Sequence, residues 1–213
     1  MIQLNVFTFN PFAENTFIIW DDVTNEAAVI DPGVSTVDEQ KVLTDFVSKN
    51  ELNIKYLINT HCHIDHILGC GFVNKKYNPL YLVPEKDLVL LEHSQQQAQM
   101  FDLDFEEPPK PDIFISEDSD ISIGNSRINF LFTPGHTPGE YCLYFEKEKI
   151  CITGDVLFKE GIGRTDLWGG NYNTLINSIE TKLLTLPDDV VIYPGHGESS
   201  TIGYEKQYNP FLN

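Results

Sequence analysis

Five of the six histidines lie in three short segments, and each segment directly follows an apolar stretch that is typical of a buried strand. The first segment, residues 61–66, reads His-Cys-His-Ile-Asp-His; the second ends in His136 and the third in His196. Side chains at strand ends are held by a rigid element yet reach the edge of a sheet, which suits metal ligands. Neutral imidazole and carboxylate groups bind zinc, iron or manganese. The three segments therefore predict a metal site.

The spacing within residues 61–66 predicts two ions rather than one. His61 and His63 are two positions apart, so they point to the same side of an extended loop. Asp65 and His66 fall where the chain turns into a predicted helix, so they can face a second point close by. Four ligand-type side chains exceed what one tetrahedral ion normally takes from a single loop. We therefore expect two neighbouring ions.

The other histidine and the cysteines are assigned structural roles. Cys62 lies between two candidate ligands, and alternation directs its side chain away from them, so we interpret it as a spacer. His93 stands beside three glutamines on a predicted helix and is expected at the solvated surface. The cysteines form no Cys-x-x-Cys pair, which favours reduced thiols over a disulfide framework; they are Cys62, Cys70, Cys142 and Cys151.

The elements that must position these segments come in an alternating order. The pattern predicts strands at 3–7, 15–20, 27–30, 54–58, 80–83 and 190–193, further strands over 113–158, and helices near 36–47, 64–77, 84–101 and 174–184. Thr36 and Glu39 have the spacing of a capping box. Strands and helices in both halves predict an α/β protein with two sheets facing each other and helices outside. We expect a single domain over residues 1–213.

Charge excludes some classes of partner. The 213 residues include 14 basic and 32 acidic side chains, a formal net charge of −18, which disfavours binding to nucleic acid or to an anionic membrane surface. No apolar run reaches the roughly 20 residues of a membrane helix. The first residues lack a basic stretch followed by an apolar one, so we expect no secretory signal and a cytoplasmic location.

Several motifs together resemble the metallo-β-lactamase fold superfamily. They are Thr-His-Cys-His-Ile-Asp-His at 60–66, Pro-Gly-His-Thr-Pro-Gly at 134–139, Thr-Gly-Asp at 153–155 and Pro-Gly-His at 194–196. The chain is most similar to the glyoxalase II (hydroxyacylglutathione hydrolase) group in a short form without the extra helical domain, because of 154–158, 161–167, 195–198 and 201–206. This resemblance implies a four-layer αβ/βα sandwich of two mixed sheets.

The resemblance also implies a role for each candidate residue. One ion would be held by His61, His63 and His136, and a second by Asp65, His66 and His196. Asp155 would bridge the ions, Asp65 and Asp155 would position the attacking hydroxide, and Asp31 would steady the ligand loop. Arg164 would contact the anionic part of the substrate. The chain departs from the group at Thr165-Asp166, where full-length members carry aromatic residues.

These assignments predict a dinuclear metallohydrolase. Two adjacent divalent ions, zinc first and iron or manganese as alternatives, lower the pKa of a shared water and polarise a carbonyl. A small thioester such as S-2-hydroxyacylglutathione suits this chemistry, because its thiolate leaves readily and no Ser or Cys nucleophile is needed. The expected partner is thus a small thiol conjugate. The sequence does not indicate an oligomeric state.

Three alternatives stay open. The His-Cys-His and Gly-Arg-Thr-Asp stretches also resemble those of persulfide dioxygenases. Those enzymes use one ferrous ion, and they typically have Pro-Ala-His-Asp where this chain has Pro-Gly-His-Gly. Another hydrolase of the same fold, acting on a lactone or β-lactam, would use similar ligands. A binding module with a structural metal would close four ligands around one ion, whereas seven candidates here imply open coordination positions.

Overall fold

The computed structural model describes residues 1–212 and contains two main β-sheets. In spatial order the first sheet consists of β1 (Ile2–Phe9), β2 (Glu14–Asp21), β3 (Glu26–Ile30), β4 (Asn53–Ile58), β5 (Leu80–Pro84) and β6 (Ile113–Ile115). Strands β1 to β3 pair antiparallel, and β3 to β6 pair parallel. Because β3 to β6 run in one direction, the loops that follow them emerge at one edge of the sheet.

The second sheet is also mixed. Its spatial order is β15 (Ser200–Thr201), β14 (Val191–Pro194), β11 (Ile150–Gly154), β10 (Tyr141–Phe145) and β9 (Asn129–Phe132). Only the β11–β14 pair is parallel. Two short hairpins complete the strands, one formed by β7 (Ser122–Ile123) and β8 (Ser126–Arg127), the other by β12 (Leu157–Phe158) and β13 (Gly161–Ile162).

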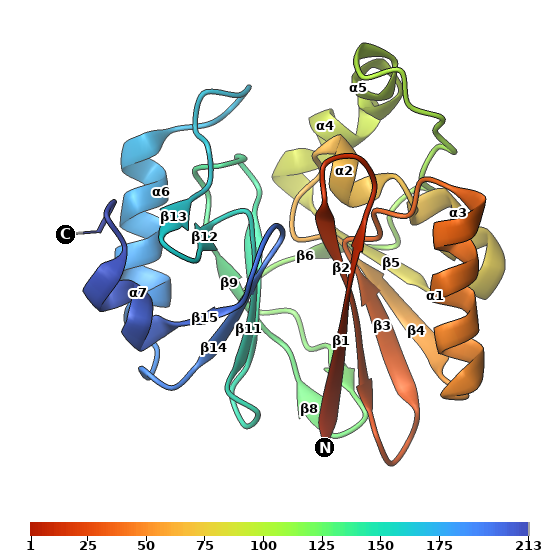
Figure 1. Ribbon diagram of the computed structural model, residues 1–213, viewed down its shortest axis with the longest axis horizontal. Helices are drawn as coiled ribbons and strands as arrows, with labels where there is room; N and C mark the ends of the chain where they lie inside the picture. Colours follow the sequence, from red (N-terminus) through yellow and green to blue (C-terminus); the bar gives the residue numbers. More distant parts are fainter. Residues whose placement is uncertain (213) are drawn as a thin grey trace.

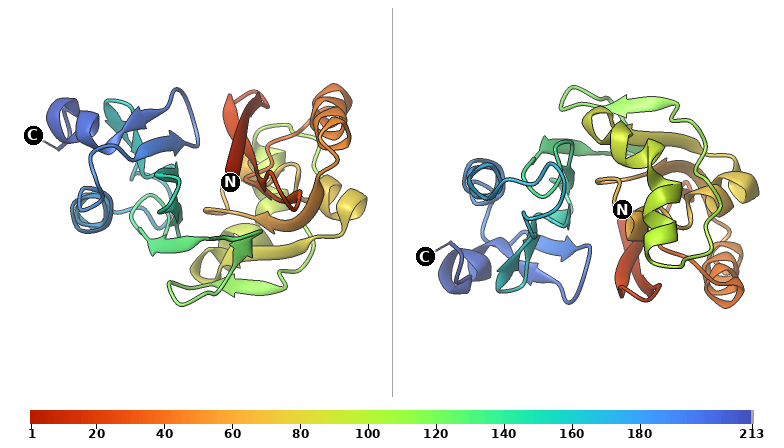
Figure 2. Two further views of the ribbon diagram at one scale, coloured as in Figure 1. Left: turned by 90° about the horizontal axis from the view of Figure 1, so that it is seen from below. Right: turned by 90° about the horizontal axis from the view of Figure 1, so that it is seen from above.

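Helices cover the outer faces of both sheets (Figures 1 and 2). The first sheet is covered by α1 (Val37–Lys49), α2 (Ile64–Ile67), α3 (Cys70–Tyr77), the 3-10 turn η1 (Glu85–Asp87), α4 (Leu88–Glu92) and α5 (Ser94–Met100). The second is covered by α6 (Tyr172–Ser178), the π-helical turn η2 (Ile179–Leu183) and α7 (Ile202–Tyr208). The chain thus has the predicted α/β architecture of two mixed sheets between outer helices.

Alternation along the strands builds the core in three layers. In β2, Phe17 and Ile19 face the second sheet and pack in the same cluster as Leu143 and Phe145 of β10. Ile18, on the opposite face of β2, packs under the helices of the first sheet. A strand buried on both faces is a rigid base for the loops at its ends.

Three predicted helices differ from the structure in their continuity. The helix expected over 64–77 breaks between α2 and α3, because Gly69 approaches its neighbours closely: its N–H donates to Pro32 O (2.7 Å), and a Cβ at Gly69 would lie 2.4 Å from Val34 Cγ2. The stretch expected over 84–101 divides into η1, α4 and α5. The last predicted helix begins as α6 and continues as a π-helical turn.

Other local predictions agree with the structure. Thr36 Oγ1 accepts the N–H of Glu39, and the Glu39 carboxylate accepts the N–H of Thr36, so the capping box is formed. All four cysteines are free and buried. Within residues 1–212, no helix combines the length and the apolar character that crossing a membrane requires.

Candidate metal centre

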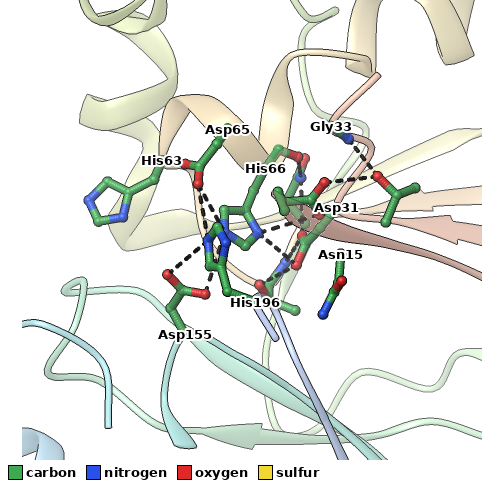
Figure 3. A network of polar contacts seen from close by, with 12 residues as sticks. Asn15, Asp31, Gly33, His63, Asp65, His66, Asp155 and His196 are labelled. Carbon is green, nitrogen blue, oxygen red and sulfur yellow. Dashed lines mark hydrogen bonds and ion pairs between the residues drawn. The ribbon is translucent and has the colours of Figure 1, made fainter. Parts of the chain in front are cut away.

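The three histidine segments and Asp155 meet where strands of both sheets end. The first segment follows β4, His136 follows β9, Asp155 follows β11 and His196 follows β14. Figure 3 shows Asp65 approaching from the side of α2 and Asp155 from the opposite sheet, with His196 between them. Residues far apart in the sequence therefore share one centre between the two sheets.

Two groups of side chains in this centre that share no residue could each hold an ion, and a third possible group, Asp31, His61 and His66, takes one histidine from each of them. In the first, ligand atoms of His61, His63 and His136 all lie within 4.8 Å of one another, and His63 Nδ1 is 2.8 Å from His136 Nε2. In the second, the same limit holds for Asp65, His66 and His196. There, Asp65 Oδ2 lies 3.2 Å from His196 Nε2 and 3.7 Å from His66 Nε2.

Asp155 faces both groups. Its Oδ1 lies 3.5 Å from His66 Nε2. Its Oδ2 lies 3.6 Å from His136 Nε2 and 3.7 Å from His196 Nε2. A carboxylate whose oxygens reach histidines of both groups is placed to contact two neighbouring cations at once.

The chemistry of the buried atoms fits metal ions. Among residues 1–212, buried atoms of the centre that have no hydrogen-bond partner include His61 Nε2, His66 Nε2 and Asp155 Oδ1. A buried polar atom without a partner is costly, and metal ions held by the two groups would satisfy all three. Two are imidazole nitrogens and one is a carboxylate oxygen, which is the donor set that zinc or iron accepts.

The electrostatics of the centre favour a cation. Burial, reinforced by the neighbouring histidines, lowers the pKa of His61 well below its usual value and that of His63 to about 3. Both rings are therefore neutral, the form that binds a metal. Burial opposes protonation of His66 too, but Asp65, Asp155 and Asp31 outweigh it and raise its pKa. Three carboxylates thus lie around His66, and its ring must give up a proton when it binds a metal.

The rings of His61, His136 and His196 each have an oxygen within hydrogen-bond distance of Nδ1, whereas His66 Nδ1 makes no hydrogen bond and only lies near a carboxylate. Arg164 O lies 2.7 Å from His136 Nδ1, and Phe12 O lies 3.1 Å from His196 Nδ1. Thr60 Oγ1 lies 3.1 Å from His61 Nδ1, and a carboxylate oxygen of Asp31 lies 3.3 Å from His66 Nδ1. Such contacts on Nδ1 leave Nε2 directed into the centre.

Asp31 also ties the first ligand segment to β3. It has a left-handed backbone, with φ of 48°, which brings its carboxylate back toward the chain after β4. There it accepts the N–H of Thr60 at 2.8 Å and the Thr60 hydroxyl at 2.6 Å. This is the position that a residue steadying the ligand loop would need.

Two buried glutamates were not found from the sequence. Glu140 Oε1 accepts the N–H of Asp155 at 2.7 Å and lies 3.5 Å from His61 Nδ1. Glu14 Oε2 accepts the Thr16 hydroxyl, and its Oε1 lies 3.9 Å from His66 Nδ1. Burial is the main cause that raises the pKa of both glutamates well above the usual value. A lone glutamate in an apolar stretch carries no sequence signal of such a role.

The other candidate residues lie outside the centre. Cys62 is buried among the helices of the first sheet, as its alternation predicted, and His93 is exposed with Nδ1 2.8 Å from Val89 O. The Arg164 side chain is exposed and makes two 2.8 Å hydrogen bonds to the carboxylate of Asp166. Arg164 is therefore joined to the centre through its backbone carbonyl, while its guanidinium faces solvent.

Asp87, in η1, links two of the ligand segments and was also missed. Its Oδ2 accepts the N–H of Cys62 at 3.2 Å and the Thr137 hydroxyl at 2.8 Å. Its Oδ1 accepts the N–H of Gly139 at 2.7 Å, where a Cβ would lie 2.6 Å from that oxygen. Burial raises the pKa of Asp87 to about 6, although these three donors oppose the shift.

This raised pKa predicts a pH-dependent effect of Asp87→Asn. Since the pKa is about 6 in the folded protein and about 4 in the unfolded chain, Asp87 stabilises the fold less as pH rises through this window. The side-chain amide introduced by the substitution does not titrate in this pH range. Its NH2 group would also face an N–H or O–H donor in place of an acceptor. We expect the variant to be less stable by about 1–3 kcal/mol, with the loss about 1 kcal/mol larger at about pH 5 than at about pH 8.

Urea unfolding of both proteins at the two pH values measures this difference. Asp189→Asn is the matched control, because Asp189 is an exposed partner of Lys149 and should change stability little. A destabilisation by Asp87→Asn that is equal at both pH values, or larger at about pH 8, would contradict the prediction.

Comparison with known proteins identifies the family of this chain. Residues 9–196 match the family described as the Metallo-beta-lactamase superfamily. The chain is 40% identical to the hydroxyacylglutathione hydrolase GloC of Haemophilus influenzae, over 100% of this chain and 99% of that protein. It is 32% identical to the human mitochondrial persulfide dioxygenase ETHE1, over 92% of this chain and 70% of that protein.

Solved structures agree with the fold. The BLEG-1 B3 metallo-β-lactamase superimposes with a TM-score of 0.90 at 29% identity and covers 99% of this chain and 100% of its own. TTHA1623 in a di-iron-bound form gives a TM-score of 0.87 at 29% identity, covering 98% of this chain and 100% of its own. With the family match over most of its length, the chain belongs to the metallo-β-lactamase superfamily.

Proposed function

We propose that this protein is a dinuclear metallohydrolase that cleaves a small thioester, with S-2-hydroxyacylglutathione as the first candidate substrate. The observation that carries the proposal is the position of Asp155, whose two oxygens face histidines of both groups. The 40% identity to a hydroxyacylglutathione hydrolase over the full chain supports the substrate class.

In this proposal the ions are held as the two groups suggest. His61, His63 and His136 would hold one ion and Asp65, His66 and His196 the other. Asp155, whose oxygens face histidines of both groups, would contribute to both sites. Zinc is the first candidate metal, and iron and manganese are alternatives. Iron is supported by the similarity to TTHA1623, which was solved in a di-iron-bound form. When bound, such ions supply hydroxide at neutral pH and polarise the substrate carbonyl.

Three side chains of this protein, those of Asp65, Asp155 and Arg164, orient the attacking water and the substrate. Asp65 and Asp155 both face His196, so their oxygens can accept hydrogen bonds from a water between them and fix its direction. The exposed guanidinium of Arg164 can exchange Asp166 for an anionic group of the thiol carrier. The buried Cys62 faces away from the centre and takes no part. The four free, buried cysteines support our further proposal of a reducing, cytoplasmic location.

A second candidate is an iron-dependent persulfide dioxygenase, favoured by the 32% identity to ETHE1. The two candidates differ in ion number and reaction. We therefore propose elemental analysis of protein purified without added metal, for the wild type and for His66→Ala. His93→Ala is the matched control, because His93 lies at the surface.

The hydrolase predicts about two ions per chain, one fewer in His66→Ala, and an unchanged content in His93→Ala. It also predicts release of thiol from S-lactoylglutathione. A single iron per chain, with oxygen uptake on a glutathione persulfide and no thiol release, would replace this proposal with the dioxygenase.

A further inference from the structure

We propose that Asn15 is a positioning residue for His196, joining the last metal-ligand segment to the first sheet. The inference rests on the proposed function, since it takes His196 as a ligand. Asn15 stands at the start of β2 and is buried, with 4% of its surface exposed. It lies close to the segment that carries His196, although about 180 residues separate them (Figure 3).

Three hydrogen bonds from Asn15 surround His196. The Nδ2 group donates to Pro194 O at 3.0 Å and to Gly197 O at 2.9 Å. The backbone N–H of Asn15 donates to Gly195 O at 2.7 Å. The accepting carbonyls lie on both sides of His196 in the chain, so a single residue fixes the direction of the loop at the ligand.

The turn before β2 and the first residue of β2 each add a contact to the same loop. The carbonyl of Phe12 lies 3.1 Å from His196 Nδ1, and Glu14 forms an isolated antiparallel bridge with His196. The side chain of His196 is itself 29% exposed, so it lacks the close packing that holds the fully buried His61 and His66. Its orientation therefore depends on the turn and on Asn15.

The loop has little room to shift without disturbing the centre. A Cβ at Gly195 would lie 2.3 Å from Asp155 Oδ1 and 2.6 Å from His66 Cε1. The backbone at Gly195 thus passes directly against two candidate ligands. A displacement of this segment would move His196 away from Asp65 and Asp155, which it now meets at 3.2 and 3.7 Å.

The amide is the group that this position requires. Both Nδ2 hydrogens have carbonyl acceptors, and Oδ1 accepts the Thr8 hydroxyl at 3.1 Å. In Asn15→Asp, a carboxylate of the same shape would face the carbonyl oxygens of Pro194 and Gly197 with no hydrogen to donate. In Asn15→Ala, those carbonyls would lose their donor without gaining a charge.

The first test uses metal-free protein and needs no activity. Hydrogen–deuterium exchange is measured by mass spectrometry for wild type, Asn15→Asp, Asn15→Ala and the control Asn5→Asp, since Asn5 lies on β1 and pairs with Ile18 of β2. We expect exchange in residues 193–198 to rise about tenfold or more in both Asn15 variants. Residues 61–66 and 133–136 should change less than about twofold, and Asn5→Asp should match the wild type.

The second test is zinc titration of the same proteins with a competing chelator. One of the two dissociation constants should rise about 10–100-fold in the Asn15 variants, as for other groups that orient a ligand. Folded Asn15 variants with wild-type exchange in 193–198 and wild-type dissociation constants would overturn the inference. If Asn15→Asp fails to fold, Asn15→Ala decides it. Should the wild type bind fewer than two ions, the proposed function fails, and the exchange result still decides whether Asn15 holds the loop.

Discussion

Replacing Asp155 with Asn should lower the rate of thioester hydrolysis at least about 1,000-fold, a loss of about 4 kcal/mol of transition-state stabilisation. The substitution keeps the shape of the side chain and the backbone hydrogen bond from residue 155 to Glu140. It removes the negative charge that faces His66, His136 and His196. Because this carboxylate reaches both groups of ligands, its loss should weaken binding at both.

The measurement combines thiol release from S-lactoylglutathione with the metal content of the same sample. We expect the ion content of Asp155→Asn to fall below that of the wild type even when zinc is supplied during purification. Asp189→Asn removes a carboxylate from an exposed ion pair with Lys149 and should retain full activity. An Asp155→Asn protein with two ions and activity within about tenfold of the wild type would show that Asp155 is not shared between the ions.

The metal centre could be predicted from the sequence where its ligand-type residues lie close together in the chain. Residues 61–66 carry four ligand-type side chains at spacings that determine their directions, and each histidine segment follows an apolar strand. The α/β architecture was predictable for the same reason, since the alternation of apolar residues indicates strands directly. Asp155 had no such pattern, because a carboxylate after Thr-Gly is common. Only its resemblance to a known motif placed it in the centre.

The contacts that hold the centre together could not be predicted, because they join distant parts of the chain. Asp87 binds groups 25 and 52 positions away, and Asn15 binds carbonyls about 180 positions away. No spacing rule relates such pairs. Single polar residues of this kind are usually exposed, so the sequence favours a surface position for each.

The broken helices have a similar cause. The apolar pattern over 64–77 continues without interruption, but Gly69 lies against Val34 and donates its N–H to Pro32 O. That close approach depends on the Asp31-Pro32-Gly33 turn, which the helical pattern does not report. The break matters for function, because it leaves α2 as a short helix that carries Asp65 and His66 at the centre.

Adding zinc to metal-free protein should raise the melting temperature by about 10–20 °C. At a free concentration about 100 times the dissociation constant, each site adds about 2.7 kcal/mol to the native state, so two sites add about 5 kcal/mol. For a chain of this size, each kcal/mol corresponds to about 2–4 °C. The physical cause is that the folded chain brings the ligand atoms of each group within 4.8 Å of one another, whereas the unfolded chain offers no such site.

Differential scanning calorimetry after chelator treatment, with and without zinc, measures this shift. His66→Ala should show about half the wild-type rise, because only the group of His61, His63 and His136 would remain complete. Magnesium should stabilise less than zinc, since nitrogen ligands suit it poorly. A rise below about 2 °C in the wild type would contradict metal binding at this centre. A wild-type rise no larger than that of His66→Ala would instead indicate a single ion, the composition expected of a persulfide dioxygenase.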